Sequence, residues 1–143
     1  MKYFVTGCAG FIGSNLVDRL LVDDRTTVTG YDNFSTGRKE FIASAVNSSG
    51  FSLVRGDVLD LPALTEAMRG SEVVFHLAAN ADVRFGTEHP RKDLEQNTIA
   101  TCNVLEAMRS NGIKKIGFSS TGSVYGEAAV IPTPEDAPFP IQT

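Results

Sequence analysis

The chain has 143 residues, of which 42% are hydrophobic and 21% charged, and its formal net charge is −4. This length suits one ordinary domain, and the composition excludes a disordered or collagen-like chain. The longest apolar run, Val73–Ala79, is interrupted by His76 and is far shorter than the ~18 residues of a membrane span. An acidic chain without a block of Lys or Arg is poorly suited to nucleic acid. Cys8 and Cys102 lack metal-ligand spacing and indicate reduced thiols, so we expect a cytoplasmic protein that binds no metal.

Short apolar runs typical of buried strands alternate with segments of helical periodicity. Strands are predicted at residues 3–5, 27–31, 51–54, 73–77 and 116–119. Helices are predicted at residues 12–21, 41–46, 61–68 and 94–108. Five strands separated by helices indicate an α/β fold of the Rossmann type, a doubly wound parallel sheet with helices on both faces. After residue 119 the pattern ends, and the prolines crowded into residues 127–143 predict an irregular tail.

A glycine-rich turn, Thr6–Gly13, joins the first predicted strand to the first predicted helix. Its spacing is Gly-x-x-Gly-x-x-Gly, in which Gly7 would permit a tight turn, Gly10 a close backbone approach and Gly13 the packing of helix on strand. Backbone N–H groups at a helix N-terminus bind pyrophosphate, so the turn predicts a dinucleotide-binding loop. Glycine turns also end ordinary strands, but the flanking strand and helix favour the phosphate loop.

An acidic residue, Asp32, ends the second predicted strand 19 residues after Gly13. A carboxylate at this place accepts hydrogen bonds from the adenosine ribose and repels a 2′-phosphate, which favours NAD over NADP. Arg38 and Lys39 follow closely and keep NADP as an alternative. Read alone, Asp32-Asn33 would also suit a turn after a strand.

Six segments of the chain, taken in order, are similar to the extended short-chain dehydrogenase/reductase family, the NAD-dependent nucleotide-sugar epimerases and dehydratases. These segments are Thr6–Gly13, Asp32-Asn33, Gly56–Val58, His76–Ala79, Asn97 and Ser119–Gly126. The chain resembles the amino-terminal half of such an enzyme. On that resemblance, residues 1–143 form a truncated NAD-binding Rossmann domain, whose carboxyl-terminal strands and substrate domain are absent. The tail at 127–143 would lead toward an absent catalytic helix.

The resemblance also implies which residues bind NAD. Phe11 and Ile12 would lie over the pyrophosphate, while Asp57 and Val58 would hold the adenine. Leu77, Ala78 and Ala79 would pass beside the nicotinamide-side ribose, and Asn97 would support the active site. The complete predicted set is Gly7, Gly10, Phe11, Ile12, Gly13, Asp32, Asn33, Asp57, Val58, Leu77, Ala78, Ala79 and Asn97. Packing would also explain Val58, Ala78 and Ala79, and a bond to a neighbouring loop would explain Asn97. His76 is predicted to be a buried, hydrogen-bonded histidine rather than a catalyst.

Thr121 is the catalytic residue that the resemblance implies, because the family has a Ser or Thr hydroxyl just after the fifth strand. That hydroxyl would bond the sugar oxygen undergoing oxidation; Ser120 is the alternative, and a turn hydroxyl is the non-catalytic interpretation. Tyr125 is not expected to be the base, since the residue four positions on is Ala129 rather than Lys. The family's Tyr-x-x-x-Lys occurs nowhere in the sequence, so we expect the chain alone to be inactive.

Within the family, the resemblance favours an NAD-dependent 4-epimerase of UDP-sugars, of the UDP-glucose/UDP-galactose type, acting by transient oxidation at C4. Gly122 and Ser123 replace the Asp-Glu pair of dehydratases. A decarboxylase, reductase or dehydratase, or a non-catalytic dinucleotide-binding module, are the alternatives. An apolar stripe on the helix at 94–108 is predicted to pack on its own sheet or, by the resemblance, against a second copy in a homodimer. Its members are Leu94, Thr98, Cys102, Leu105 and Met108.

Overall fold

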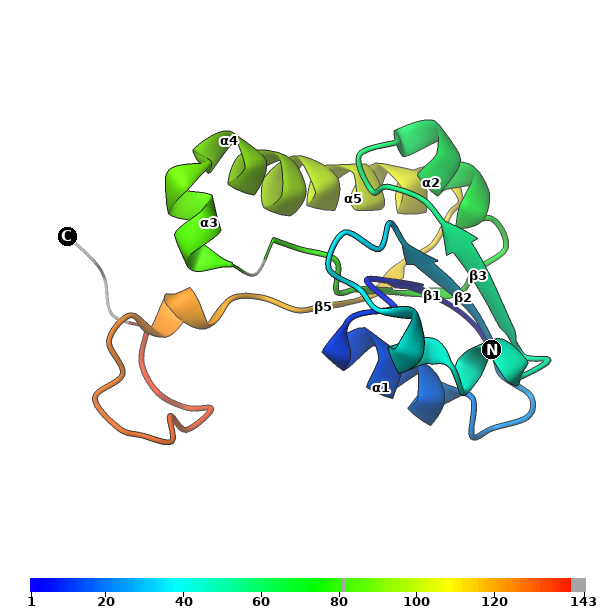
Figure 1. Cartoon of the computed structure of the whole chain (residues 1–143), viewed down its shortest axis with the longest axis horizontal. Coiled ribbons are helices and arrows are strands. Elements are labelled where there is room, and N and C mark those ends of the chain that lie inside the picture. Colours follow the sequence, from blue (N-terminus) through cyan, green and yellow to red (C-terminus); the bar gives the residue numbers. More distant parts are fainter. Residues whose placement is uncertain (81, 140–143) are drawn as a thin grey trace.

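A parallel five-stranded sheet forms the centre of the computed structural model, which describes residues 1–80 and 82–139 (Figure 1). Its strands are β1 (Lys2–Thr6), β2 (Thr27–Asp32), β3 (Phe51–Arg55), β4 (Val73–His76) and β5 (Lys115–Phe118). Their order in the sheet is β3-β2-β1-β4-β5, and every neighbouring pair is parallel. The strand order reverses between β1 and β4, and at such a switch point the carboxyl ends of the strands open a crevice for ligands.

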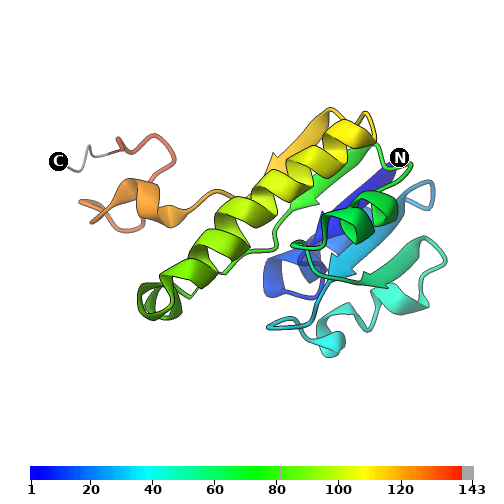
Figure 2. The ribbon, with the colours of Figure 1, turned by 90° about the horizontal axis from the view of Figure 1, so that it is seen from above.

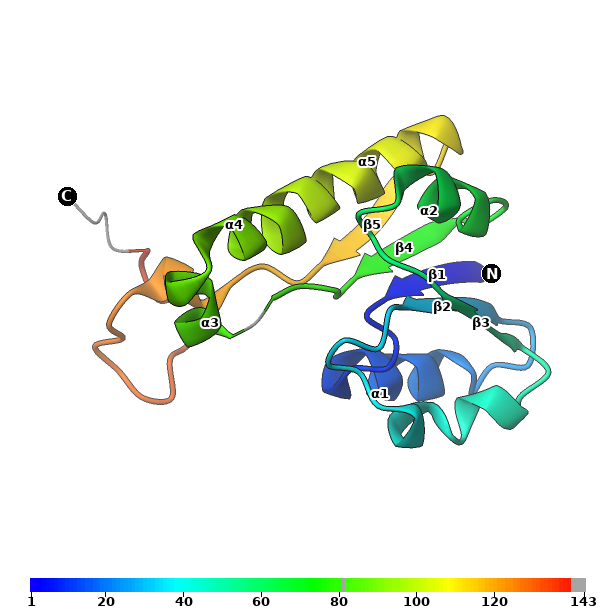
Figure 3. The same cartoon turned by 45° about the horizontal axis from the view of Figure 1, so that its top comes forward.

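Helices cover both faces of this sheet, which confirms the predicted doubly wound α/β fold (Figure 3). On one face lie α1 (Phe11–Leu20) and the 3₁₀ turns η1 (Lys39–Ile42) and η2 (Ala45–Asn47). On the other face lie α2 (Leu61–Ala67) and α5 (Ala100–Ser110). The remaining elements are α3 (Val83–Glu88), α4 (Pro90–Asp93), the π-helical η3 (Leu94–Ile99) and the 3₁₀ turn η4 (Gly122–Tyr125).

Two apolar cores follow from the alternation of side chains along the strands. Phe4 points to the α2–α5 side, where Val104 belongs to the same buried cluster. The next residue, Val5, points to the α1 side and packs with Val17. Because both faces are covered, the central strands carry apolar residues on both sides, as buried parallel strands do.

Local sequence signals set the ends of the helices on the α2–α5 side. The Asp60 carboxylate accepts a hydrogen bond of 3.1 Å from the N–H of Ala63, which caps α2. At the end of α5, Gly112 has a φ of +71°, and the N–H of Ile113 donates to the Met108 carbonyl at 2.9 Å. Such a left-handed glycine with a backward hydrogen bond closes a helix and lets the chain turn into β5.

The helix predicted at residues 41–46 is wrong, because this stretch forms the two 3₁₀ turns η1 and η2. So short a segment gains too few hydrogen bonds to offset helix nucleation. Asn47 further favours the turn, since its side-chain amide donates to the Ala43 carbonyl at 2.8 Å.

The long helix predicted at residues 94–108 is present but differs in its start and in its buried face. It begins at Pro90 with α4, continues through the π-helical η3 and ends with α5 (Figure 2). The wider turn of a π-helix shifts the side-chain register. The buried residues of α5 are Ala100, Val104, Ala107 and Met108. Packing on the chain's own sheet was therefore wrongly predicted for Leu94, Thr98, Cys102 and Leu105, which are exposed.

Beyond β5 the chain leaves the sheet, and residues 126–139 form bends and turns (Figures 1 and 2). Among residues 1–80 and 82–139, no helix is both long enough and apolar enough to cross a bilayer.

Candidate functional site

The glycine turn between β1 and α1 has the steric features expected of it. Gly7 has a φ of +70°, and a Cβ there would lie 2.8 Å from the backbone nitrogen of Ala78. A Cβ on Gly13 would lie only 2.1 Å from the Gly7 carbonyl oxygen. The first hydrogen bond within the helix runs from the N–H of Ser14 to the Gly10 carbonyl, at 2.9 Å. Helix geometry therefore gives the N–H groups of residues 11–13 no carbonyl partner within α1, which suits them to bind an anion.

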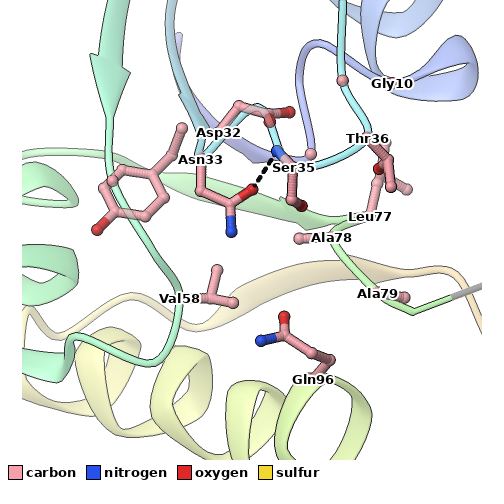
Figure 4. A pocket seen from close by; sticks show the side chains of 14 residues that line it. Gly10, Asp32, Asn33, Ser35, Thr36, Val58, Leu77, Ala78, Ala79 and Gln96 are labelled. Atoms are coloured by element: carbon pink, nitrogen blue, oxygen red, sulfur yellow. Dashed lines mark hydrogen bonds between the residues drawn. The ribbon is translucent and has the colours of Figure 1, made fainter. Parts of the chain in front are cut away.

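A pocket opens at the carboxyl edge of the sheet beside this turn (Figure 4). Its walls come from the glycine turn, the segment after β2, the segment after β3, the segment after β4, and η3. The lining residues are Gly7, Gly10, Tyr31, Asp32, Asn33, Ser35, Thr36, Gly37, Gly56, Val58, Leu77, Ala78, Ala79 and Gln96. The pocket thus lies at the switch point between β1 and β4, where an open parallel sheet binds its ligand.

Asp32 connects the glycine turn to the segment that follows β2. Its Oδ2 accepts from the N–H of Ala9 at 2.9 Å, and its Oδ1 accepts from the N–H of Phe34 at 2.8 Å. Gly37 lies so close that a Cβ there would approach Asp32 Oδ1 to 2.9 Å, and the N–H of Arg38 donates to the Ala9 carbonyl at 2.9 Å. Asp32 is 8% exposed, and its carboxylate holds two walls of the pocket together.

Val58 and Asp57, predicted on the adenine side, take different places. Val58 lines the pocket, whereas Asp57 is not among the lining residues. The Asp57 Oδ2 accepts from Asn33 Nδ2 at 3.1 Å and so orients a lining side chain. Tyr31 donates its hydroxyl to the Asp57 carbonyl at 3.1 Å. Burial, assisted by the charges of Asp60 and Asp57, raises the pKa of Tyr31 and keeps this donor protonated.

The segment after β4 forms the opposite wall through Leu77, Ala78 and Ala79. Asn97 lies behind this wall: its Oδ1 accepts from the N–H of Asn80 at 2.8 Å, and its Nδ2 donates to the Asn80 carbonyl at 3.2 Å. The loop contact considered for Asn97 is therefore observed, and the residue positions the wall from outside the lining.

Several predicted residues contribute no side chain to the pocket lining. Phe11 and Ile12 are 75% and 64% exposed, so they can contribute only their N–H groups at the start of α1. Thr121 is exposed after β5 and is not in the lining. His76 is buried and hydrogen-bonded to Thr6 and Thr101, as predicted for a structural histidine.

Six lining residues were not predicted as binding residues: Tyr31, Ser35, Thr36, Gly37, Gly56 and Gln96. A polar turn directly after Asp32 could have indicated Ser35–Gly37. No local signal indicated Gln96, which lies in the π-helical η3 and faces the pocket (Figure 4).

Both cysteines are free thiols, with Cys8 buried in the glycine turn and Cys102 exposed on α5. Burial, together with the charge of Asp32, raises the pKa of the Cys8 thiol to about 12, which keeps it protonated and unreactive. Across the described part of the chain, no group of three or more His, Cys, Asp or Glu side chains could hold a metal ion.

Curated relatives with similar sequences include enzymes that act on UDP-sugars by name. A UDP-glucose 4-epimerase from Mycolicibacterium smegmatis is 44% identical over 141 residues, a match that covers 96% of this chain and 44% of that protein. UDP-glucuronic acid decarboxylase 3 from Arabidopsis thaliana is 37% identical over 135 residues, covering 94% of this chain and 38% of that protein. The chain therefore spans less than half the length of these relatives.

Solved structures agree with this relationship. A UDP-galactose 4-epimerase superposes with a TM-score of 0.80 at 41% identity, covering 98% of this chain and 45% of that chain. A UDP-glucose 4-epimerase from Stenotrophomonas maltophila was solved with bound NAD and formylated UDP-arabinopyranose. It superposes with a TM-score of 0.86 at 26% identity, covering 100% of this chain and 44% of that chain. Residues 3–143 match the model of the NAD dependent epimerase/dehydratase family. The chain belongs to this family.

Proposed function

We propose that residues 1–143 form the NAD-binding part of a UDP-sugar 4-epimerase of the UDP-glucose/UDP-galactose type. The observation that carries the proposal is the joining of the glycine turn to Asp32 at the switch point, through the bond from the N–H of Ala9 to Asp32 Oδ2. One carboxylate thereby sets the spacing between a pyrophosphate site and a ribose site.

The residues present fit a dinucleotide sterically. Gly7 and Gly13 have no room for a Cβ, so the backbone there stays accessible at the helix N-terminus. The N–H groups of Phe11 and Ile12 would bind the pyrophosphate, and Asp32 with Asn33 would bind the adenosine ribose. Each Asp32 oxygen has a second lone pair for a ribose hydroxyl beyond its present N–H partner.

The other predicted residues would hold the two bases of the cofactor. Val58, together with Asp57, would hold the adenine. Leu77, Ala78 and Ala79 would lie beside the nicotinamide-side ribose, with Asn97 holding that wall in place. When bound, NAD accepts a hydride and returns it. Thr121 would orient the sugar oxygen, a positioning role.

Relatives of both reaction types support an epimerase first and a decarboxylase second. The M. smegmatis 4-epimerase is 44% identical, and the A. thaliana UDP-glucuronic acid decarboxylase is 37% identical. Gly122 and Ser123, in place of an Asp-Glu pair, argue against a dehydratase. Assays of the complete gene product with UDP-glucose, UDP-galactose and UDP-glucuronate separate the candidates. Interconversion of the first two is expected, and turnover of UDP-glucuronate alone would reverse the order.

Binding of NAD can be tested directly by calorimetry. We expect the wild-type chain to bind NAD more tightly than NADP, and Asp32→Ala to weaken NAD binding at least about tenfold. Asp32→Asn keeps an acceptor for one N–H group and should give a smaller loss. Asp18→Ala, on the exposed side of α1, is the matched control. Unchanged NAD affinity in Asp32→Ala would contradict the ribose role.

Turnover by these residues alone is not expected. Residues 1–143 contain no Tyr-x-x-x-Lys, so no phenol–ammonium pair can remove the sugar hydroxyl proton. Incubation of the chain with NAD and UDP-galactose should therefore yield no UDP-glucose. Formation of UDP-glucose would show that another residue is the base.

A homodimer through the long helix, and a cytoplasmic location, complete the proposal. Leu94, Ile99 and Leu105 leave an exposed apolar stripe along η3 and α5, and the free thiols suit a reducing compartment. Light scattering should give the mass of a dimer, and Leu105→Glu should give a monomer. A monomeric wild type would contradict the proposed dimer.

A further inference from the structure

The buried ring of His76 bridges two elements on opposite sides of the switch point. His76 ends β4 and is 1% exposed. Its Nδ1 lies 2.8 Å from Thr6 Oγ1 at the end of β1, and its Nε2 lies 3.1 Å from Thr101 Oγ1 on α5. Phe118 of β5 stacks on the ring at a centroid distance of 5.7 Å. The imidazole thus connects the glycine-turn strand to the long helix behind the pocket.

The other partners of the two hydroxyls determine where the ring proton lies. Thr6 Oγ1 accepts from the N–H groups of Leu77 and Ala78, each at 3.2 Å; the Leu77 N–H also reaches the Thr6 carbonyl at 3.3 Å. Since a hydroxyl has two lone pairs and one proton, the Thr6 O–H is left to donate to Nδ1. Thr101 donates its own proton to the Asn97 carbonyl at 2.6 Å, so its oxygen accepts from Nε2–H.

We infer that His76 is a positioning residue, held as the neutral Nε2–H tautomer, that fixes the pocket wall at residues 77–80 through Thr6, Thr101 and Asn97. Both ends of this wall are connected to the helical turn that contains Asn97 and Thr101. At the start of the wall, the N–H of Ala78 donates to Thr6, and the His76 ring connects Thr6 to Thr101. At its end, the N–H of Asn80 donates to the Asn97 side chain. Gln96, on the same turn, faces the pocket (Figure 4). The consequence for ligand binding rests on the proposed dinucleotide function, whereas the ring proton's position does not.

A different protonation state would break this arrangement. An Nδ1–H group would point a third N–H at Thr6 Oγ1 and leave the hydroxyl proton of Thr6 without its acceptor. A charged ring would do the same. Burial lowers the pKa of His76 to about 4, which keeps the ring neutral at physiological pH.

Nitrogen NMR of the histidine rings tests the tautomer without any ligand. The chain has two histidines, so His89→Gln leaves the signals of His76 alone. At pH 7 we expect the chemical shifts of a pyrrole-type Nε2 and a pyridine-type Nδ1. An Nδ1–H tautomer, or a ring that titrates near pH 6.5, would overturn the inference.

Two single variants and their combination test the coupling. His76→Asn keeps an acceptor for Thr6 but is too short for Thr101, and Thr101→Val removes the acceptor of Nε2–H at similar volume. Each variant should weaken NAD binding about tenfold. The double variant should bind NAD no more weakly than either single variant, because both substitutions break the same chain of hydrogen bonds from Thr6 through His76 to Thr101. Thr101→Ser keeps the hydroxyl and should bind as the wild type does. Additive losses of NAD affinity in the double variant, or weakened NAD binding by Thr101→Ser, would overturn the inference.

Amide hydrogen exchange keeps the test independent of NAD. Exchange at Leu77 and Ala78 should become about tenfold faster in His76→Asn and Thr101→Val, and stay unchanged in Thr101→Ser. Unchanged protection in the first two would overturn the positioning role. If the wild type fails to bind NAD while this exchange pattern holds, the proposed function fails and the positioning inference stands.

Discussion

The segments that follow β1 and β5 leave the same edge of the sheet, yet they are held very differently. After β1, Gly7 donates to the Tyr31 carbonyl, Ala9 donates to Asp32, and the Ala9 carbonyl accepts from Arg38. After β5, the N–H of Ser119 donates to the His76 carbonyl at 3.3 Å, and residues 119–122 are exposed. Within the described sheet, β1 is hydrogen-bonded to both β2 and β4, whereas β5 is hydrogen-bonded to β4. The segment proposed to bind the cofactor is therefore held to the loop after β2 by these bonds, whereas the segment carrying Thr121 lies exposed beyond β5.

Replacing one glycine by alanine in each segment should give the largest difference in the free energy of unfolding. In Gly13→Ala the new Cβ would lie 2.1 Å from the Gly7 carbonyl oxygen, whereas a Cβ on Gly122 meets nothing within 4 Å. We expect Gly13→Ala to lower the free energy of unfolding by more than about 3 kcal/mol, despite the higher helix propensity of Ala. Gly122→Ala should change it by less than about 0.5 kcal/mol. Urea denaturation measures both, and equal losses would remove the contrast between the segments.

Acid should loosen the segments beside β1 and β4 through His76. Burial lowers the pKa of His76 to about 4 in the folded chain, against 6.5 for a free ring. Between these values the unfolded chain binds more protons, so stability falls as the pH falls from 6.5 toward 4. The loss attributable to this group is at most roughly 3 kcal/mol.

Urea denaturation at several pH values between 7 and 4.5 measures this slope. His76→Asn has no ring to titrate, so its slope should be shallower than that of the wild type. Identical slopes in the two proteins would contradict the lowered pKa of His76.

Opening the loop after β2 should have an intermediate effect. A Cβ on Gly37 would lie 2.9 Å from both Ala9 Cβ and Asp32 Oδ1. We expect Gly37→Ala to cost about 1–2 kcal/mol of stability and to weaken NAD binding about tenfold, because the carboxylate must move. Calorimetry checks the affinity, with Gly122→Ala as control. Wild-type affinity in Gly37→Ala would mean that this loop moves without disturbing the ribose site.

Replacing Thr121 should have the smallest effect on these quantities. Thr121 is exposed and not in the pocket lining, so Thr121→Ala should change stability and NAD affinity by less than about 0.5 kcal/mol. In the complete gene product, the same variant should lower kcat. A strong loss of NAD affinity would instead place Thr121 in the cofactor site and weaken the contrast between the segments.

Much of the fold and part of the site could be predicted from local patterns. Apolar runs gave the five strands, and the glycine spacing indicated the turn in which Gly7 takes a positive φ. These signals are readable because strand periodicity and the steric needs of glycine act within a few residues. The short helix at 41–46 was wrongly predicted because its propensity did not outweigh nucleation and a side-chain bond of Asn47.

The order of elements, the glycine turn and the acidic end of β2 are properties of the residue sequence, because each depends on neighbours along the chain. Tertiary packing determined the side-chain orientations and the contacts between elements that are distant in the sequence. Gln96 in the π-helical η3 lines the pocket, Leu105 in α5 is exposed, and Asn97 bonds to Asn80. His76 meets Thr6, which lies 70 residues earlier. Such pairs depend on how helices rest on a sheet, and no pattern of nearby residues encodes that contact.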